Sequence, residues 1–253
     1  MMNNFSSKEH VEFFGVKFDL VTMEEALERI ARIIEQHNLT QYVGVNVAIL
    51  VMAQRDKELR NILNSCKFIT ADGLGILWGA KLLGIHIPER VPAVDLMLNL
   101  MPIAEKKGYR MFFLGASGKV IKKAVEKCKS QYPDLQIAGY HSGYFKKEEE
   151  EKIVEEIINS KADILCVGMP SPEKELFIRK NLQRMNIPFA MGVGGTFDVI
   201  AEKVKRAPIW MQKMGMEWIY RLLQEPRKMW KRYLVTNSKY AWMLIKTKLY
   251  IKG

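Results

Sequence analysis

Residues 111–118, with the sequence MFFLGASG, decide the fold that we expect of this chain. Four consecutive apolar residues predict a short buried strand, and the glycines that follow predict a turn into a helix. The same order recurs along the chain. Strands are predicted at residues 42–47, 68–70, 164–167 and 189–191 and near 136, and helices at 49–63, 76–83, 148–158 and 173–185, with another ending near 130. This alternation is typical of an α/β fold with a mainly parallel, Rossmann-like sheet flanked by helices.

Three turns at the ends of predicted strands are candidates for a ligand site, because ligands of such sheets bind beyond the carboxyl ends of the strands. One is acidic and two are rich in glycine: Ala71-Asp72-Gly73-Leu74-Gly75, Gly115-Ala116-Ser117-Gly118 and Gly192-Val193-Gly194-Gly195-Thr196. Free backbone N–H groups at the start of a helix can bind a phosphate, and glycine permits its close approach. Neither glycine turn is a complete Rossmann fingerprint or P-loop, and such turns are structural as often as functional.

Asp72 is the strongest catalytic candidate. It follows a predicted strand and precedes a glycine, so its carboxylate is expected at the ligand edge of the sheet. A carboxylate held near a substrate hydroxyl can act as a general base. The alternative is that Asp72 only caps the following helix.

The excess of positive over negative charge is confined to the last fifth of the chain. Residues 203–253 contain 13 Lys or Arg, two acidic residues and four of the five tryptophans, which accounts for the whole net charge of +11. We therefore expect an α/β catalytic domain at residues 1–202 and a helical, membrane-docking appendage at 203–253. Helices are expected at 211–224 and, after Pro226, from 227 onward. The alternative is a packed helix pair whose lysines are solvated.

The location expected of the protein is cytoplasmic, peripheral on the inner face of the cell membrane. The opening residues have no secretory pattern, and no apolar run approaches transmembrane length. Three widely spaced cysteines suit a reducing compartment.

We expect no metal ion and no cofactor. No two aspartates lie at DxD spacing, and the four histidines are scattered. Metal-dependent sugar transferases commonly hold the diphosphate of their donor through Mg²⁺ or Mn²⁺ bound by such an aspartate pair. In a sugar transferase without a metal, the leaving diphosphate would be neutralised by cationic side chains, although each candidate could equally be a solvated surface charge. The candidates for binding the diphosphate or the acceptor are Arg90, Arg206, Arg221, Arg227 and Arg232.

Two other functions compete with a sugar transferase as interpretations of these residues. A nucleic-acid-binding protein could use the basic, tryptophan-rich segment to contact phosphates and stack on bases. The neutral α/β body with its glycine turns favours a small-molecule crevice and no nucleic acid. A nicotinamide-dependent enzyme ranks last, because the chain lacks GxGxxG.

An ordered set of motifs resembles one family. Besides the turns above, it includes Glu89-Arg90-Val91, Phe113-Leu114-Gly115, Gly168-Met169-Pro170, Val204-Lys205-Arg206-Ala207-Pro208 and Gly215-Met216-Glu217-Trp218 with Arg221. From about residue 13 to about 234, the chain is similar to the WecG/TagA/CpsF glycosyltransferases.

The resemblance implies an inverting, metal-independent enzyme of the GT-E type. Such enzymes move a sugar from a UDP-sugar to a polyprenyl-diphosphate-linked sugar in cell-surface polysaccharide synthesis. Asp72 matches the proposed base, and Arg221 falls on an arginine of the family's appendage. Residues expected to bind the donor are Asn46, Gly115, Gly168, Glu173, Gly194, Gly195, Thr196 and Asp198. The sequence leaves open whether the protein forms a homo-oligomer.

Two positions depart from the family pattern. Gly44-Val45-Asn46 replaces the usual Thr-x-Asn. The family usually has a glutamine after its G-x-P-x segment, and this chain has Ser171-Pro172-Glu173 there. Both usual residues are placed to touch donor or acceptor. Glucose or another hexose is therefore left open beside N-acetylmannosamine as the transferred sugar.

Overall fold

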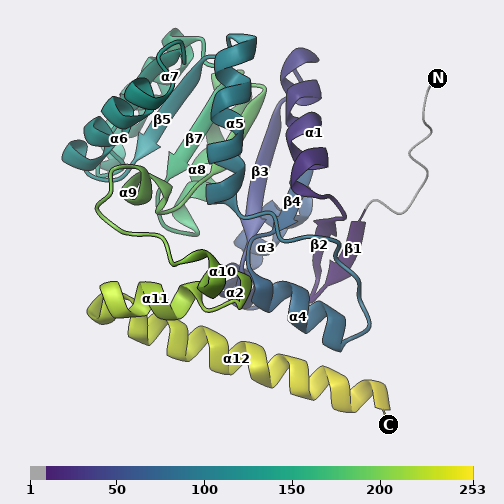
Figure 1. Ribbon diagram of the computed structural model, residues 1–253. Coiled ribbons are helices and arrows are strands. Elements are labelled where there is room, and N and C mark those ends of the chain that lie inside the picture. Colours follow the sequence, from purple (N-terminus) through teal and green to yellow (C-terminus); the bar gives the residue numbers. More distant parts are fainter. Residues whose placement is uncertain (1–9, 253) are drawn as a thin grey trace. The chain divides into compact units, whose positions relative to one another are not determined.

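The protein is an α/β structure built on a six-stranded sheet (Figure 1). The computed structural model describes residues 10–252, apart from the side chains of Lys228, Arg232, Ile251 and Lys252. The strand order is β4-β3-β8-β7-β5-β6. The expected Rossmann-like α/β fold is thereby confirmed. The chain divides into two compact units. The first comprises the described residues up to Glu24, Gly44–Pro92 and those from Arg206 onward, and the second comprises Glu25–Val43 and Ala93–Lys205.

The second unit contains most of the parallel sheet. Its strands are β5 (Met111–Gly115), β6 (Ile137–His141), β7 (Ile164–Gly168) and β8 (Phe189–Gly192), with the start of β3 (Thr40–Val45). In register, Gly115 of β5 lies opposite Gly168 of β7, so these two strands end together. Their side chains are buried apolar residues, as expected of a parallel sheet covered on both faces.

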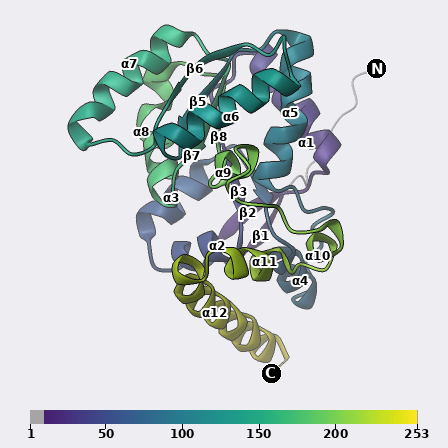
Figure 2. The same cartoon turned by 60° about the vertical axis from the view of Figure 1, so that its left-hand side comes forward.

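Helices cover both faces of this sheet (Figure 2). Leu165 and Val167 pack against α7 (Glu150–Ser160) and α8 (Glu173–Met185). On the other side, α5 (Ala93–Lys107) and α6 (Gly118–Gln131) meet where the Cys128 sulfur lies 3.9 Å from that of Met101. Phe113 of β5 contacts Phe197 of α9 (Thr196–Ile200), with ring centroids 5.3 Å apart. Burial raises the pKa of the Cys128 thiol to about 11, so this thiol stays protonated and acts as a core residue.

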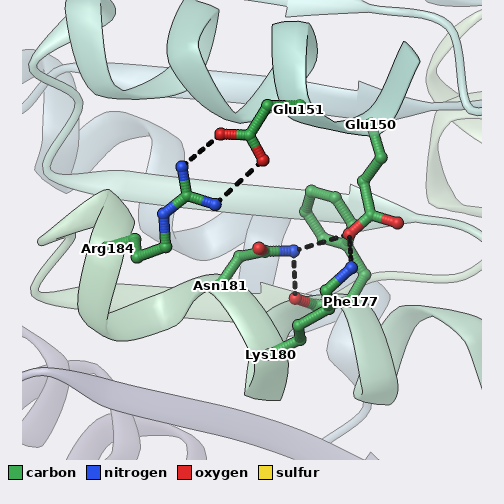
Figure 3. A network of polar contacts seen from close by, with 6 residues as sticks. All are labelled: Glu150, Glu151, Phe177, Lys180, Asn181 and Arg184. Carbon is green, nitrogen blue, oxygen red and sulfur yellow. Dashed lines mark hydrogen bonds and ion pairs between the residues drawn. The ribbon is translucent and has the colours of Figure 1, made fainter. Parts of the chain in front are cut away.

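A polar network joins α7 to α8 at the edge of this core (Figure 3). The Glu150 carboxylate accepts hydrogen bonds from Lys180 Nζ (2.9 Å) and from Asn181 Nδ2 (3.1 Å). Asn181 Nδ2 also donates to the Phe177 carbonyl, and Arg184 forms a two-pronged ion pair with Glu151. Burial opposes ionisation of Glu150, but the hydrogen bonds from Lys180 and Asn181 outweigh it and lower its pKa. The contribution of Glu150 to stability is therefore present above the ordinary pKa of 4.5 and is lost as the pH falls through its lowered value.

The first unit begins with an antiparallel hairpin of β1 (His10–Phe13) and β2 (Val16–Asp19). At the end of the hairpin, Asp19 Oδ2 accepts a hydrogen bond of 2.7 Å from the backbone N–H of Ile69, in β4 (Phe68–Ala71). The helices of this unit are α2 (Val47–Ala53), α3 (Lys57–Ser65), α4 (Leu74–Leu82), α10 (Ile209–Lys213), α11 (Glu217–Gln224) and α12 (Pro226–Lys252).

The long helix α12 packs on α2 and α4 (Figure 1), and its Tyr240 contacts α4. The Tyr240 hydroxyl donates a hydrogen bond of 2.7 Å to the Gly75 carbonyl in α4. A Cβ on Gly79 would lie 1.9 Å from the same hydroxyl, so only glycine leaves room for this ring. Burial raises the pKa of Tyr240, which keeps the phenol protonated and able to donate. Among the described residues, none of the helices is both long and apolar enough to cross a membrane.

The structure differs from the sequence prediction at several elements. The helix predicted at residues 49–63 is two helices, because Asp56 caps the start of α3 with a hydrogen bond to Leu59 N. The helix predicted at 211–224 is also two, because Gly215 adopts a φ of 67° between α10 and α11. The β1–β2 hairpin and α5, which contains Pro102, were not predicted.

Candidate functional site

Asp72 lies in the turn between β4 and α4, in the first unit. Its backbone N–H donates to the Val45 carbonyl at the end of β3 (3.0 Å), and Val91 N donates to the Ala71 carbonyl (2.9 Å). These bonds fix the backbone on both sides of the strand end. The Asp72 side chain is half-buried, so it keeps access to solvent from a fixed backbone.

Asn46 lies beside this acidic turn. It ends β3 and caps α2, where its Oδ1 accepts hydrogen bonds from Ala48 N (3.1 Å) and Ile49 N (3.2 Å). A Cβ on Gly73 would lie 3.9 Å from the Asn46 Cβ. One on Gly75 would clash with Val47 at 2.8 Å. The glycines of the Ala71–Gly75 motif thus let the starts of α2 and α4 pack closely, and they bring Asn46 next to Asp72.

Two of the predicted arginines meet at one carboxylate. Arg90 Nη1 lies 3.2 Å from Glu217 Oε2, and Arg206 Nη2 lies 3.8 Å from Glu217 Oε1. Arg206 also donates to Gln212 Oε1 (3.0 Å). The two guanidinium groups are mostly buried, with exposed side-chain fractions of 18% and 21%. Both guanidinium groups thus gather around one carboxylate.

The remaining arginines are more dispersed. Arg221 forms an ion pair of 2.8 Å with Glu225, one turn further along the chain. Arg227 is exposed in the first turn of α12. The side chain of Arg232 lies outside the described residues.

Four glycines meet at the carboxyl ends of the strands in the second unit. A Cβ on Gly115, whose φ is 151°, would lie 2.6 Å from the backbone of Gly168. A Cβ on Gly143 would lie 2.9 Å from Gly115 Cα, and one on Gly168 would lie 2.4 Å from the Phe197 ring and 3.0 Å from the Gly194 carbonyl. Close backbone packing therefore explains the glycines at 115, 143 and 168.

Gly194 differs from the other three. It adopts a φ of 53°, and a Cβ there would meet nothing within 4 Å, so the space beside it is open. Gly195 follows as the residue that precedes α9. The buried Thr196 hydroxyl donates to the Val193 carbonyl (2.6 Å), which closes the turn. Asp198 accepts a hydrogen bond of 3.0 Å from Lys203 Nζ, which links the turn to the start of the basic segment.

A buried charged cluster follows β7, and the sequence analysis did not find it. Lys174 and Glu175 are 6% and 1% exposed and form an ion pair of 2.5 Å. Lys174 also donates to Ser171 Oγ, which donates to Glu175 Oε1 (3.0 Å). Gln41 Nε2 donates to the Glu175 carbonyl (3.0 Å). Within the described residues, Glu175 Oε2 and Gln41 Oε1 are buried without a hydrogen-bond partner.

This cluster lies beside the glycine turn after β8. A Cβ on Gly192 would lie 2.8 Å from Lys174 Cε, so the lysine stem runs against the end of β8. The predicted Glu173, in contrast, is exposed. The adjacent charges of Lys174 and Glu175 were the available signal, but adjacent charges usually mark a solvated face.

No metal-binding cluster stands out between residues 10 and 252, where no group of three or more His, Cys, Asp or Glu could hold an ion.

Comparisons with known proteins agree with these motifs. Residues 11–252 match the model of the family described as "Glycosyl transferase WecG/TagA/CpsF family". The chain is 34% identical over 218 residues to the N-acetylglucosaminyldiphosphoundecaprenol N-acetyl-beta-D-mannosaminyltransferase of Bacillus subtilis (strain 168), covering 84% of each chain. It is 31% identical over 229 residues to the protein of the same name from Staphylococcus aureus (strain MW2), covering 90% of this chain and 88% of that protein.

Proposed function

Because the chain belongs to the WecG/TagA/CpsF glycosyltransferase family, we propose that it moves a sugar from a UDP-sugar to a sugar linked to polyprenyl diphosphate. The reaction inverts the configuration at the anomeric carbon and needs no metal ion. The names of the relatives make N-acetylmannosamine the first sugar to test as donor and N-acetylglucosaminyl-diphosphoundecaprenol the first acceptor. The observation that carries this proposal is the half-buried Asp72, held by its backbone beside Asn46.

Asp72 acts as the general base in this proposal. Its carboxylate removes the proton from the acceptor hydroxyl as that oxygen attacks the anomeric carbon of the donor. A new C–O bond forms on the face opposite UDP while the bond from the anomeric carbon to the diphosphate breaks.

The departing diphosphate carries negative charge that the protein has to stabilise. Arg90 and Arg206 are the arginines that we assign to this role, because both side chains are mostly buried and meet at Glu217, and a positive charge in such a site stabilises a diphosphate more strongly than it does in water. Arg221, Arg227 and Arg232 extend the positive charge along α11 and α12. In the second unit, the open space beside Gly194 lets a donor group approach the backbone.

The test of this function is a transfer assay with purified protein. UDP release is measured with UDP-N-acetylmannosamine, UDP-N-acetylglucosamine, UDP-glucose and UDP-galactose, each with an N-acetylglucosaminyl-diphosphate lipid and with excess EDTA. The proposal expects one donor to give acceptor-dependent UDP release that EDTA leaves unchanged. Absence of release from every donor, or loss of release with EDTA, would count against the proposed reaction or its independence of metal.

The appendage at residues 203–253 is proposed to dock on the membrane. One stripe of α12 exposes large apolar side chains with helical spacing: Trp242 (66% exposed), Ile245 (51%), Leu249 (68%) and Tyr250 (89%). Lys246 borders the same stripe. Tryptophan and tyrosine suit the membrane interface, and a basic side chain near anionic lipid contributes about 1 kcal/mol.

Replacing Trp242 and Leu249 together with serine is expected to reduce binding to phosphatidylglycerol vesicles at least about fivefold, because apolar area available to the interface is lost. The measurement is co-flotation with vesicles. The control pair is Tyr140→Ser with Ile158→Ser, two exposed apolar residues of the second unit, which should bind like the unchanged protein. Equal flotation of the two double variants would show that this stripe does not take part in docking.

A further inference from the structure

A second apolar surface lies on α4, directly after the proposed base. A cavity of about 380 Å³ opens between α4 and the loop that follows it. Its lining includes Leu74, Leu77, Trp78 and Ile85, with Lys81 and His86 as its polar residues. Trp78 is 54% exposed, whereas tryptophan is highly buried on average in folded proteins.

The cavity follows one face of the helix. Leu74, Leu77, Trp78 and Lys81 are spaced by three or four residues, so their side chains share a stripe of α4. The opposite side of α4 is held by Tyr240, and the Trp78 ring rests against the turn at Gly215, where a Cβ would lie 2.6 Å from it. The cavity is therefore framed by packed elements, and its tryptophan is held in place.

The cavity starts close to the proposed catalytic group. Leu74 is the first residue of α4 and stands two positions after Asp72. At a rise of about 1.5 Å per residue, the stripe from Leu74 to Lys81 extends about 10 Å along the helix. An acceptor whose sugar hydroxyl contacts Asp72 can place the group attached to the other side of that sugar against this stripe.

We propose that this cavity, which we call the α4 groove, binds the first isoprene units of the acceptor's lipid chain. The inference rests on the proposed function and adds a subsite to it. The lining is mainly apolar, which suits a hydrocarbon chain and not a sugar, because sugars need hydrogen-bonding groups. The volume lies within the range of about 300–1,000 Å³ that is usual for small-ligand sites.

The stripe on α12 does not suit the same role. Its cavity is lined by residues of α12 alone, from Trp242 to Tyr250. A surface on one side of a single helix can lie on a bilayer, but it provides no opposing wall for one chain. The α4 groove has both a helix and a loop as walls, and so it is the surface that fits a single prenyl chain.

The first test compares two soluble acceptors. Both carry N-acetylglucosamine diphosphate, one on a farnesyl chain of three isoprene units and the other on a methyl group. Trp78→Ala is expected to raise KM for the farnesyl acceptor about tenfold with kcat unchanged, and to leave KM for the methyl acceptor unchanged. The control is Ile158→Ala, which removes an exposed apolar side chain from α7 and should change neither value.

The outcomes separate this inference from the proposed function. If the unchanged protein transfers sugar to neither acceptor, the proposed function fails. If it uses both acceptors with equal KM, or if Trp78→Ala changes both equally, the function stands and the α4 groove does not bind the chain.

A second test uses the unchanged protein and so does not depend on how a variant folds. The farnesyl acceptor carries a diazirine on its second isoprene unit, and the labelled peptide is identified after irradiation. Labelling of residues 74–87 is the expected result. Labelling of residues 242–250, or labelling that an excess of the unmodified farnesyl acceptor does not suppress, would overturn the proposal.

Discussion

Asp72→Asn is expected to lower the rate of sugar transfer about a thousandfold. General bases typically contribute factors of about 10² to 10⁴, and asparagine keeps the size of the side chain while losing its basicity. The Asp72 backbone is held by hydrogen bonds that the substitution leaves in place. UDP binding, followed by isothermal titration, should therefore change little while kcat falls.

The matched control for this experiment is Asp134→Asn, at an exposed aspartate of the second unit. It should retain the transfer rate of the unchanged protein. Full activity in the Asp72 variant would remove this carboxylate from the mechanism. A parallel loss of UDP binding and of the thermal transition would point to a structural role for this carboxylate in the turn between β4 and α4.

Gly168→Ala is expected to have the largest effect on stability, lowering the free energy of unfolding by about 3 kcal/mol. The added Cβ would lie 2.4 Å from the Phe197 ring and 3.0 Å from the Gly194 carbonyl, and Phe197 is fully buried. Neither neighbour can move without disturbing the ends of β5 and β7. Urea unfolding followed by circular dichroism measures the change.

Gly118→Ala is the matched control for Gly168→Ala. A Cβ at Gly118 would meet nothing within 4 Å, and this residue begins α6 without a positive φ. Alanine there should raise the free energy of unfolding by about 0.5 kcal/mol, because it reduces the freedom of the unfolded chain. Equal unfolding free energies for the two variants would contradict the close packing around Gly168.

The repeating order of strands and helices was predictable from the sequence because each strand is a short apolar run followed by a turn. Predicted and observed bounds agree for α8, where residues 173–185 form one helix. The predicted helix boundaries were wrong where a single residue decides whether a helix continues or ends. Asp56 starts a new helix through its own side chain, and Gly215 permits a positive φ, and neither choice changes the hydrophobic pattern.

The candidate site was only partly predictable, for a different reason. Asp72 and Asn46 follow strands, and their proximity follows from the pairing of strand ends. The meeting of Arg90 with Arg206 depends on segments more than a hundred residues apart, which spacing alone does not reveal. The cluster of Lys174 and Glu175 was missed because burial of an ion pair depends on what packs around it. The same limit applies to the α4 groove, whose walls are formed by the fold.

Tyr240 has a consequence for any shortened version of this enzyme. Its hydroxyl reaches the first turn of the helix that begins two residues after Asp72, and its ring occupies the space left by Gly79. Deleting the C-terminal segment would thus remove the proposed membrane-docking surface and, at the same time, a brace on the segment that carries the proposed catalytic carboxylate. An inactive truncated enzyme would therefore not distinguish a lost anchor from a loosened active-site helix.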